Sequence, residues 1–119
     1  MKMSGAAEKV FVGRRVIVPQ SMGTRQEGIY VEVNGQPLKT YHRIWRHSEG
    51  FEWGYQGSGP AQLAVALVME VYGDEELVKI VHQEVKRQLV AKLPERWWMI
   101  HESQVREIVD KIVAKGREL

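Results

Sequence analysis

The first half of the chain shows the residue pattern of β-strands. Residues 9–13 and 16–18 are rich in β-branched and aromatic side chains, and residues 29–33 alternate between apolar and polar positions. Between these runs, residues 19–28 contain Pro, Gly, Ser and several polar side chains. Such a composition is typical of loops, so we expect a long loop here, flanked by strands.

A tight hairpin is predicted directly after the third run. Asn34-Gly35 follows residue 33, and this dipeptide favours the positive φ angles of a two-residue hairpin turn. We therefore expect residues 29–33 to fold back on residues 36–40. Because Pro37 has no N–H, the returning strand should lie at an edge of the sheet or begin irregularly.

The second half of the chain changes to helical spacing. Residues 60–72 are almost entirely apolar, which predicts a central, buried helix that ends at Gly73. Residues 74–93 begin with acidic side chains and continue with apolar positions three and four residues apart, which predicts an amphipathic helix that Pro94 stops.

The last elements complete the predicted fold. Residues 97–100 are apolar and suit a further strand, with Trp97 and Trp98 at the core and its rim. Apolar residues from 105 to 113 form the stripe of a final helix that Gly116 should terminate. We predict an α+β class, in which a small antiparallel N-terminal sheet packs on the buried central helix and two amphipathic helices.

Composition limits the class of protein. With 119 residues, 44% of them hydrophobic, the chain has the size of a single domain, residues 1–119, and its modest core makes self-association a reasonable expectation. The absence of cysteine excludes disulfides, thiolate catalysis and Cys-based zinc sites. No apolar run approaches the roughly 18 residues of a membrane span. These features predict a cytoplasmic protein.

One stretch resembles a known family. Residues 50–67 read GFEWGYQGSGPAQLAVAL, and they are similar to the FEWGYGGSGPAQLA stretch that marks a family of small bacterial and phage-encoded domains of unknown function. A weaker similarity extends to the hairpin before it and to Leu93-Pro94 after it. Gln56 stands where the family has Gly. The resemblance implies a cytoplasmic protein of phage or mobile-element origin, and it implies no activity, cofactor or catalytic residue.

A basic and aromatic segment is the strongest sign of a charged partner, since the net charge of +2 is too small to indicate nucleic-acid binding by itself. If residues 39–47 form a strand, alternate side chains share one face, on which bases could stack while arginine binds phosphate. The residues of this predicted surface are Tyr41, Arg43, Trp45, Arg46 and His47. The alternative is an exposed strand whose aromatic rings pack on the core.

The glycine-rich loop before the central helix is a second candidate. Gly57, Ser58 and Gly59 precede Pro60, and free N–H groups at a helix N-terminus attract anions such as phosphate. The spacing matches neither a Walker A loop nor a dinucleotide fingerprint. The alternative is architectural: Ser58 or Gly59 caps the helix, and the glycines permit a sharp turn.

The same segment carries residues that suit proton transfer or metal binding. Glu52 or His47 could move a proton beside the glycine loop, but for Glu52 we favour a structural role, in which it pairs with an arginine or accepts hydrogen bonds from N–H groups of the loop. His42, His47, Glu49 and Glu52 match no defined ligand motif, so we expect no metal and no cofactor. His82 and His101 have no partner nearby in sequence and are interpreted as surface or cap residues.

Three function hypotheses follow. The first is a cytoplasmic binding module that contacts nucleic acid or a host protein through the basic and aromatic surface. The second is a small enzyme that holds a phosphorylated or nucleotide-like substrate at Gly57, Ser58 and Gly59. The third is a structural or assembly protein that forms homo-oligomers. Whether the chain catalyses a reaction is left open by its sequence.

Overall fold

The computed structural model describes residues 8–23 and 25–117. Its four strands form one antiparallel sheet with the order β3-β2-β1-β4, and its three helices follow or interrupt these strands, which confirms the α+β class. The elements along the chain are β1 (Val10–Pro19), a 3-10 turn η1 (Ser21–Gly23), β2 (Arg25–Val33), β3 (Gln36–Pro37), α1 (Ser58–Tyr72), α2 (Glu75–Gln88), a second 3-10 turn η2 (Val90–Lys92), β4 (Trp97–His101) and α3 (Glu102–Arg117).

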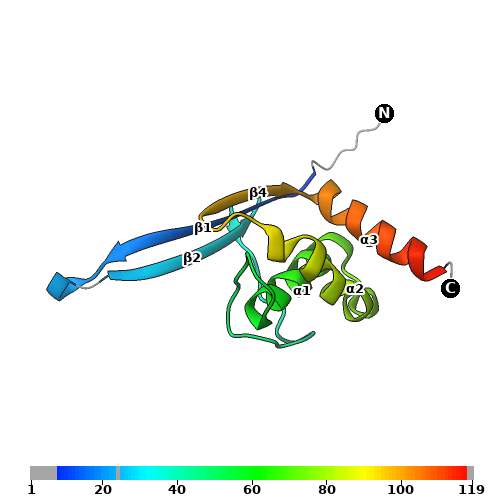
Figure 1. Ribbon diagram of the computed structural model, residues 1–119, viewed down its shortest axis with the longest axis horizontal. Helices are drawn as coiled ribbons and strands as arrows, with labels where there is room; N and C mark the ends of the chain where they lie inside the picture. Colours follow the sequence, from blue (N-terminus) through cyan, green and yellow to red (C-terminus); the bar gives the residue numbers. More distant parts are fainter. Residues whose placement is uncertain (1–7, 24, 118–119) are drawn as a thin grey trace.

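The helices lie to one side of the sheet, as Figure 1 shows. Side chains that point toward them from the strands are buried in the core, among them Phe11, Val31, Trp98 and Ile100. In β4 buried and exposed residues alternate strictly. Because neighbouring side chains of a strand point to opposite faces, every second residue of the sheet lies on a face that none of the described helices covers.

The centre of the molecule is α1, as its sequence predicts. Its residues from Gly59 to Val68 are all buried, and Gly73 ends the helix in the left-handed conformation with its N–H bonded to Met69. Asp74 then caps α2 by accepting a hydrogen bond from the N–H of Leu77 at 3.1 Å. A helix that is apolar on all sides has no face to offer to water, and this is why it occupies the core.

The hairpin between β2 and β3 is confirmed, but its second strand is short. Asn34 and Gly35 have φ values of 50° and 82°, as the two-residue turn requires. Only Gln36 and Pro37 pair with β2. After the proline, the N–H of Leu38 bonds to Val31 and the leucine side chain enters the core. The chain from 38 to 57 then runs without helix or strand.

The predicted long loop at residues 19–28 is wrong. Pairing of β1 with β2 continues to Pro19 opposite Arg25, so the connection is short. Figure 1 shows this outer part of the hairpin projecting away from the helices. A two-stranded ribbon with water on both faces needs no alternation of apolar and polar side chains, because it covers no core. The polar composition of residues 19–28 therefore indicated a long loop, whereas residues 25–28 belong to the strand β2.

Two smaller observations complete the fold. The prediction that Gly116 terminates the last helix is wrong, because α3 continues to Arg117. Gly116 lies on the exposed last turn, where the conformational cost of a helical glycine is only about 1 kcal/mol. Among residues 8–23 and 25–117, no helix combines the length and the apolar character needed to span a membrane.

Candidate functional site

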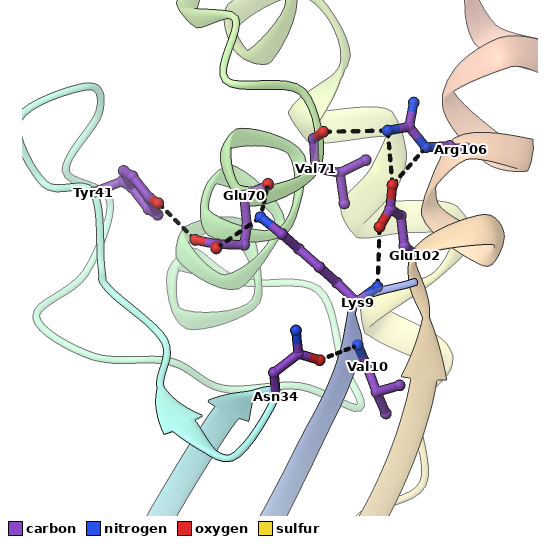
Figure 2. A network of polar contacts seen from close by, with 8 residues as sticks. All are labelled: Lys9, Val10, Asn34, Tyr41, Glu70, Val71, Glu102 and Arg106. Carbon is purple, nitrogen blue, oxygen red and sulfur yellow. Dashed lines mark hydrogen bonds and ion pairs between the residues drawn. The ribbon is translucent and has the colours of Figure 1, made fainter. Parts of the chain in front are cut away.

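The basic and aromatic segment does not form a strand. It belongs to the irregular stretch between β3 and α1, and Tyr41 has a φ of 58°, which breaks the alternation of side chains. The Tyr41 hydroxyl turns toward α1 and donates a hydrogen bond to Glu70 at 2.6 Å (Figure 2). Pro37 ends the pairing with β2, so residues 39–47 follow the surface of α1 instead of joining the sheet.

Tyr41 is part of a polar network that joins Lys9, just before β1, and the first turn of α3 to α1. Figure 2 shows Lys9 donating from Nζ to the carbonyl and the carboxylate of Glu70, while its backbone N–H bonds to Glu102 at 3.0 Å. Burial, together with the nearby Glu70 carboxylate, raises the pKa of Tyr41 to about 12. Burial alone would raise the pKa of Glu70, but the hydrogen bonds from Tyr41 and Lys9 outweigh it and lower the pKa. These hydrogen bonds hold the start of β1 and the segment around Tyr41 against α1.

Gln62 of α1 organises the next part of the segment. Its side-chain oxygen accepts hydrogen bonds from the N–H groups of His47 and Ser48 at 2.7 and 3.1 Å. Its amide nitrogen donates to the carbonyls of Thr40 and Trp45 at 2.7 and 3.0 Å. This role of Gln62 is not among the predictions made from the sequence, although an amide side chain within an otherwise apolar helix is a signal that it satisfies backbone groups of a neighbouring irregular segment.

His47 lies against a histidine that was expected at the surface. That interpretation of His82 is wrong: its side chain is 1% exposed, because α2 turns it toward the segment. The His82 Nδ1 lies 2.8 Å from the Val78 carbonyl, so it carries the proton and donates. The His82 Nε2 then accepts from the Nε2–H of His47 at 2.9 Å. Trp45 stacks on His47 with ring centroids 5.2 Å apart.

The two arginines of the predicted surface have carboxylate neighbours. Arg43 is largely exposed and lies 3.8 Å from Glu75, and Arg46 pairs with Glu49. Of the aromatic side chains here, Trp45 is exposed, whereas Tyr41 packs against the core. The structure thus brings Trp45 and His47 together but does not build the expected row of alternating rings and guanidinium groups. Binding of nucleic acid by these residues stays a prediction.

At the glycine loop, α1 begins at Ser58, and Gly57 occupies the cap position without any side-chain hydrogen bond. The expected capping by Ser58 or Gly59 is therefore wrong. Gly59 is required because a Cβ there would lie 2.6 Å from the Cβ of Glu52. Close packing against Glu52 thus explains why residue 59 is a glycine. Anion binding was the other explanation for this residue. Binding of phosphate by Gly57, Ser58 and Gly59 stays a prediction.

Glu52 pairs with an arginine, as one of its interpretations predicted, but the partner is Arg15 of β1. The Arg15 side chain is 9% exposed, with Nη2 2.6 Å from Glu52 and its guanidinium carbon 4.4 Å from the centre of the Trp53 ring. Its Nε donates to the Glu95 carbonyl at 2.8 Å. Arg15 thereby ties the sheet to the loop. Among the described residues, no hydrogen bond or ion pair joins Glu52 to His47.

An open cavity of about 440 Å³ lies beside this arginine. The guanidinium is bonded to Glu52 and to two carbonyls, and its Nη1 lies 3.7 Å from the Glu27 carboxylate, so two acidic side chains already balance its charge. Within residues 8–23 and 25–117, no three His, Asp or Glu side chains are grouped in a way that could hold a metal ion. The cavity is lined by Arg15, Glu27, Trp53, Gly54, Tyr55, Leu93 and Glu95.

The uncovered side of the sheet carries the largest group of exposed apolar side chains on neighbouring strands. We call it the open face. Register places Trp97, Arg14 and Tyr30 in one row across three strands. Trp97, Met99, Tyr30 and Val16 are between 38% and 55% exposed. The open face includes Val12, Arg14, Val16, Val18, Tyr30, Glu32, Trp97 and Met99.

The sequence contains a signal for this face in the strand at residues 97–100. In residues 97–100 every position is apolar, although a strand covered on one side needs only alternate apolar residues. Trp98 and Ile100 are buried, as a core strand requires, while Trp97 and Met99 are exposed. The surplus apolar residues mark a face that has a further use.

A model of a protein family matches residues 11–111 of the chain, which span the sheet, the segment around Gln62 and most of the helices. The chain belongs to the family of unknown function DUF6166. This membership confirms the resemblance noted in residues 50–67. No curated protein matches the chain, and no solved structure matches it. The description of DUF6166 names no activity and no partner. A phage origin and the binding or catalytic roles predicted from the sequence therefore stay predictions.

Proposed function

We propose that this DUF6166 protein is a protein-binding module that holds its partner on the open face of the sheet. The observation that carries the proposal is the row formed by Trp97, Arg14 and Tyr30, with exposed Met99 and Val16 beside it. Large apolar side chains gathered on one face of a folded domain are the usual mark of an interaction surface. The lack of cysteine favours a reducing compartment, so we propose that the module acts in the cytoplasm.

The residue types of the open face are those that contribute most to protein interfaces. Trp, Tyr, Met and Arg are enriched at the centres of such interfaces, and truncation of a central Trp or Tyr often costs about 2 kcal/mol or more in binding. The Arg14 guanidinium lies 5.3 Å from the centre of the Tyr30 ring. Both side chains are thereby held in place before a partner arrives, which reduces the entropy lost on binding.

Charge favours a protein over nucleic acid as the partner. Binding to phosphates needs cations that release their counterions. The open face has one cation, Arg14, and its guanidinium lies 3.5 Å from the Glu32 carboxylate. Bases could stack on Trp97 and Tyr30, but no unpaired cation of the face would hold the phosphates between them. An apolar protein surface needs no such cation.

Oxidative footprinting tests the proposal, since Trp, Tyr and Met side chains react readily when exposed. The oxidation of Trp97 and Met99 is compared between dilute purified protein and a lysate of cells that make the protein naturally, before and after nuclease digestion. We expect protection of both residues in the lysate by about fivefold or more, as for side chains buried at an interface centre. Nuclease should leave this protection unchanged.

Met22 is the internal control, because it is 95% exposed at the turn between β1 and β2, outside the open face. Its oxidation should be the same in all samples. Equal oxidation of Trp97 in dilute protein and lysate would refute the proposal. Protection that nuclease abolishes would show that the face binds nucleic acid instead.

A further inference from the structure

This inference rests on the proposed function and names the partner. We propose that the open face binds a second copy of the same chain, with two sheets packed face to face about a two-fold axis near the middle of β1. In such an arrangement the same residues serve both sides of the interface. Three properties of the face support a second copy over an unrelated protein.

The first property is its charge. A surface that binds itself must not carry an excess of one sign, since the two copies would repel each other. Arg14 and Glu32 neutralise one another across β1 and β2 at 3.5 Å. Arg14 and Glu32 therefore leave this part of the face without a net charge, which is the balance that self-association requires.

The second property is the division of β1 into two halves. Residues 10–14 pair with β4. Residues 15–19 pair with β2 and, apart from the N–H of Arg15, which bonds to the Arg96 carbonyl, project beyond β4. At about 3.3 Å per residue, each half is roughly 16 Å long. When a two-fold axis passes between the two halves of β1, the projecting half in each copy lies over the inner half of β1 in the other copy. Val16 and Val18 would then cover Val12 and Met99 of the second copy.

The third property is the exposure of the projecting ribbon, by which we mean the outer part of the β1–β2 hairpin. Two-stranded hairpins are only marginally stable alone in water, and no helix lies beneath this part of the sheet (Figure 1). The Tyr30 ring leans over Gly28, where a Cβ would lie 2.9 Å from the ring. Glycine there lets the tyrosine lie along the ribbon and extend the apolar surface outward. Packing against a second copy would stabilise both projecting ribbons at once.

Sedimentation equilibrium of the purified chain over the micromolar range tests the inference. We expect a monomer–dimer equilibrium, and the Trp97→Ser variant should weaken it by about tenfold or more, as the loss of a central aromatic does. Ile80→Ser is the matched control, since Ile80 is 74% exposed but lies on α2, away from the open face. This control should dimerise like the unaltered chain. Circular dichroism verifies that both variants are folded.

Cross-linking gives a second readout that does not depend on weakening the interface. The chain has no cysteine, so Val16→Cys introduces a single thiol beside the proposed axis. A short bis-maleimide should join two Val16→Cys chains efficiently, and two Ile80→Cys chains poorly. A monomer at every concentration, or equal cross-linking of the two variants, would overturn the inference.

Footprinting separates this result from the proposed function. If concentrated purified protein protects Trp97 as the lysate does, the partner is a second copy. Protection in the lysate alone, with a monomeric purified protein, would refute the second copy while retaining a protein-binding face. Absence of protection in both samples would refute both proposals.

Discussion

Gly13 of β1 sets the tightest local constraint in the sheet. A Cβ on this residue would lie 2.2 Å from Cε2 of Trp98, so the indole of β4 can cover β1 only where a side chain is missing. In the sequence, a glycine within a strand indicates only a weak position or a close approach. The structure identifies the group that approaches as the buried Trp98.

We therefore expect Gly13→Ala to lower the free energy of unfolding by about 1–3 kcal/mol, the usual cost of overpacking a core. Gly50→Ala is the control, because a Cβ at Gly50 meets no atom within 4 Å. Its effect should stay within about 0.5 kcal/mol. Urea unfolding at neutral pH measures both variants, and an equal stability of the two would contradict the packing argument.

A second property at the residue scale is the pH dependence that the histidine pair confers. Burial lowers the pKa of both His47 and His82 below the ordinary value of 6.5, and the nearby Lys86 ammonium lowers both further. As pH falls below 6.5, the unfolded chain takes up protons that the folded protein resists. The contribution of the pair to stability is complete above this pH and is lost below it.

We expect the free energy of unfolding to fall as the pH is lowered from about 7.5 to about 5.5, a range that includes the ordinary histidine titration. A double variant, His47→Gln with His82→Gln, should show a smaller fall over this range, whatever its absolute stability. The glutamates whose pKa is lowered from 4.5, such as Glu70 and Glu102, act only at more acidic pH. An unchanged slope in the double variant would assign the titration to other groups.

At the scale of elements, α1 determines where everything else packs. Four parts of the chain contact α1 or its buried neighbours: α2, α3, η2 and the irregular segment of residues 38–57. Its all-apolar surface made this position predictable, while its single buried amide, Gln62, holds the segment that precedes it. The helix thus serves as a core and as a template for chain without regular structure.

Leu67→Ala should lower the free energy of unfolding by about 2–5 kcal/mol, because Leu67 is fully buried in α1 and the truncation leaves a cavity. Ile80→Ala on the exposed side of α2 should change it by less than about 1 kcal/mol. Thermal or urea unfolding of the two variants provides the comparison. A loss below about 1 kcal/mol for Leu67→Ala would show that α1 is not the centre of the core.

At the scale of the whole molecule, the helices and the sheet leave one face free. Helices cover one side of the sheet, and the strand side chains that face them, among them Phe11, Val31, Trp98 and Ile100, fill the core. Other large apolar side chains, such as Trp97 and Met99, stay exposed on the open face. A monomer gains nothing in stability from exposing Trp97 and Met99. Their placement is explained if the functional unit contains a partner on this side.

The sequence by itself determined the α+β class, the central helix, the Asn34-Gly35 turn and the strand at residues 97–100. Each of these depends on short-range information: the period of apolar positions, the φ preference of a turn residue, or the capping of a helix. Such preferences act within a few residues and need no knowledge of the rest of the chain. For this reason these features could be predicted from the sequence alone.

Only the tertiary structure decided which distant residues meet. The pairing of Arg15 with Glu52, of His47 with His82 and of Gln62 with the segment before α1 joins positions from 14 to 37 residues apart. The projecting ribbon and the row of Trp97, Arg14 and Tyr30 arise from strand register, which no local pattern specifies. A surface for binding is a property of such long-range contacts, because it brings together residues that are neighbours only in the folded chain.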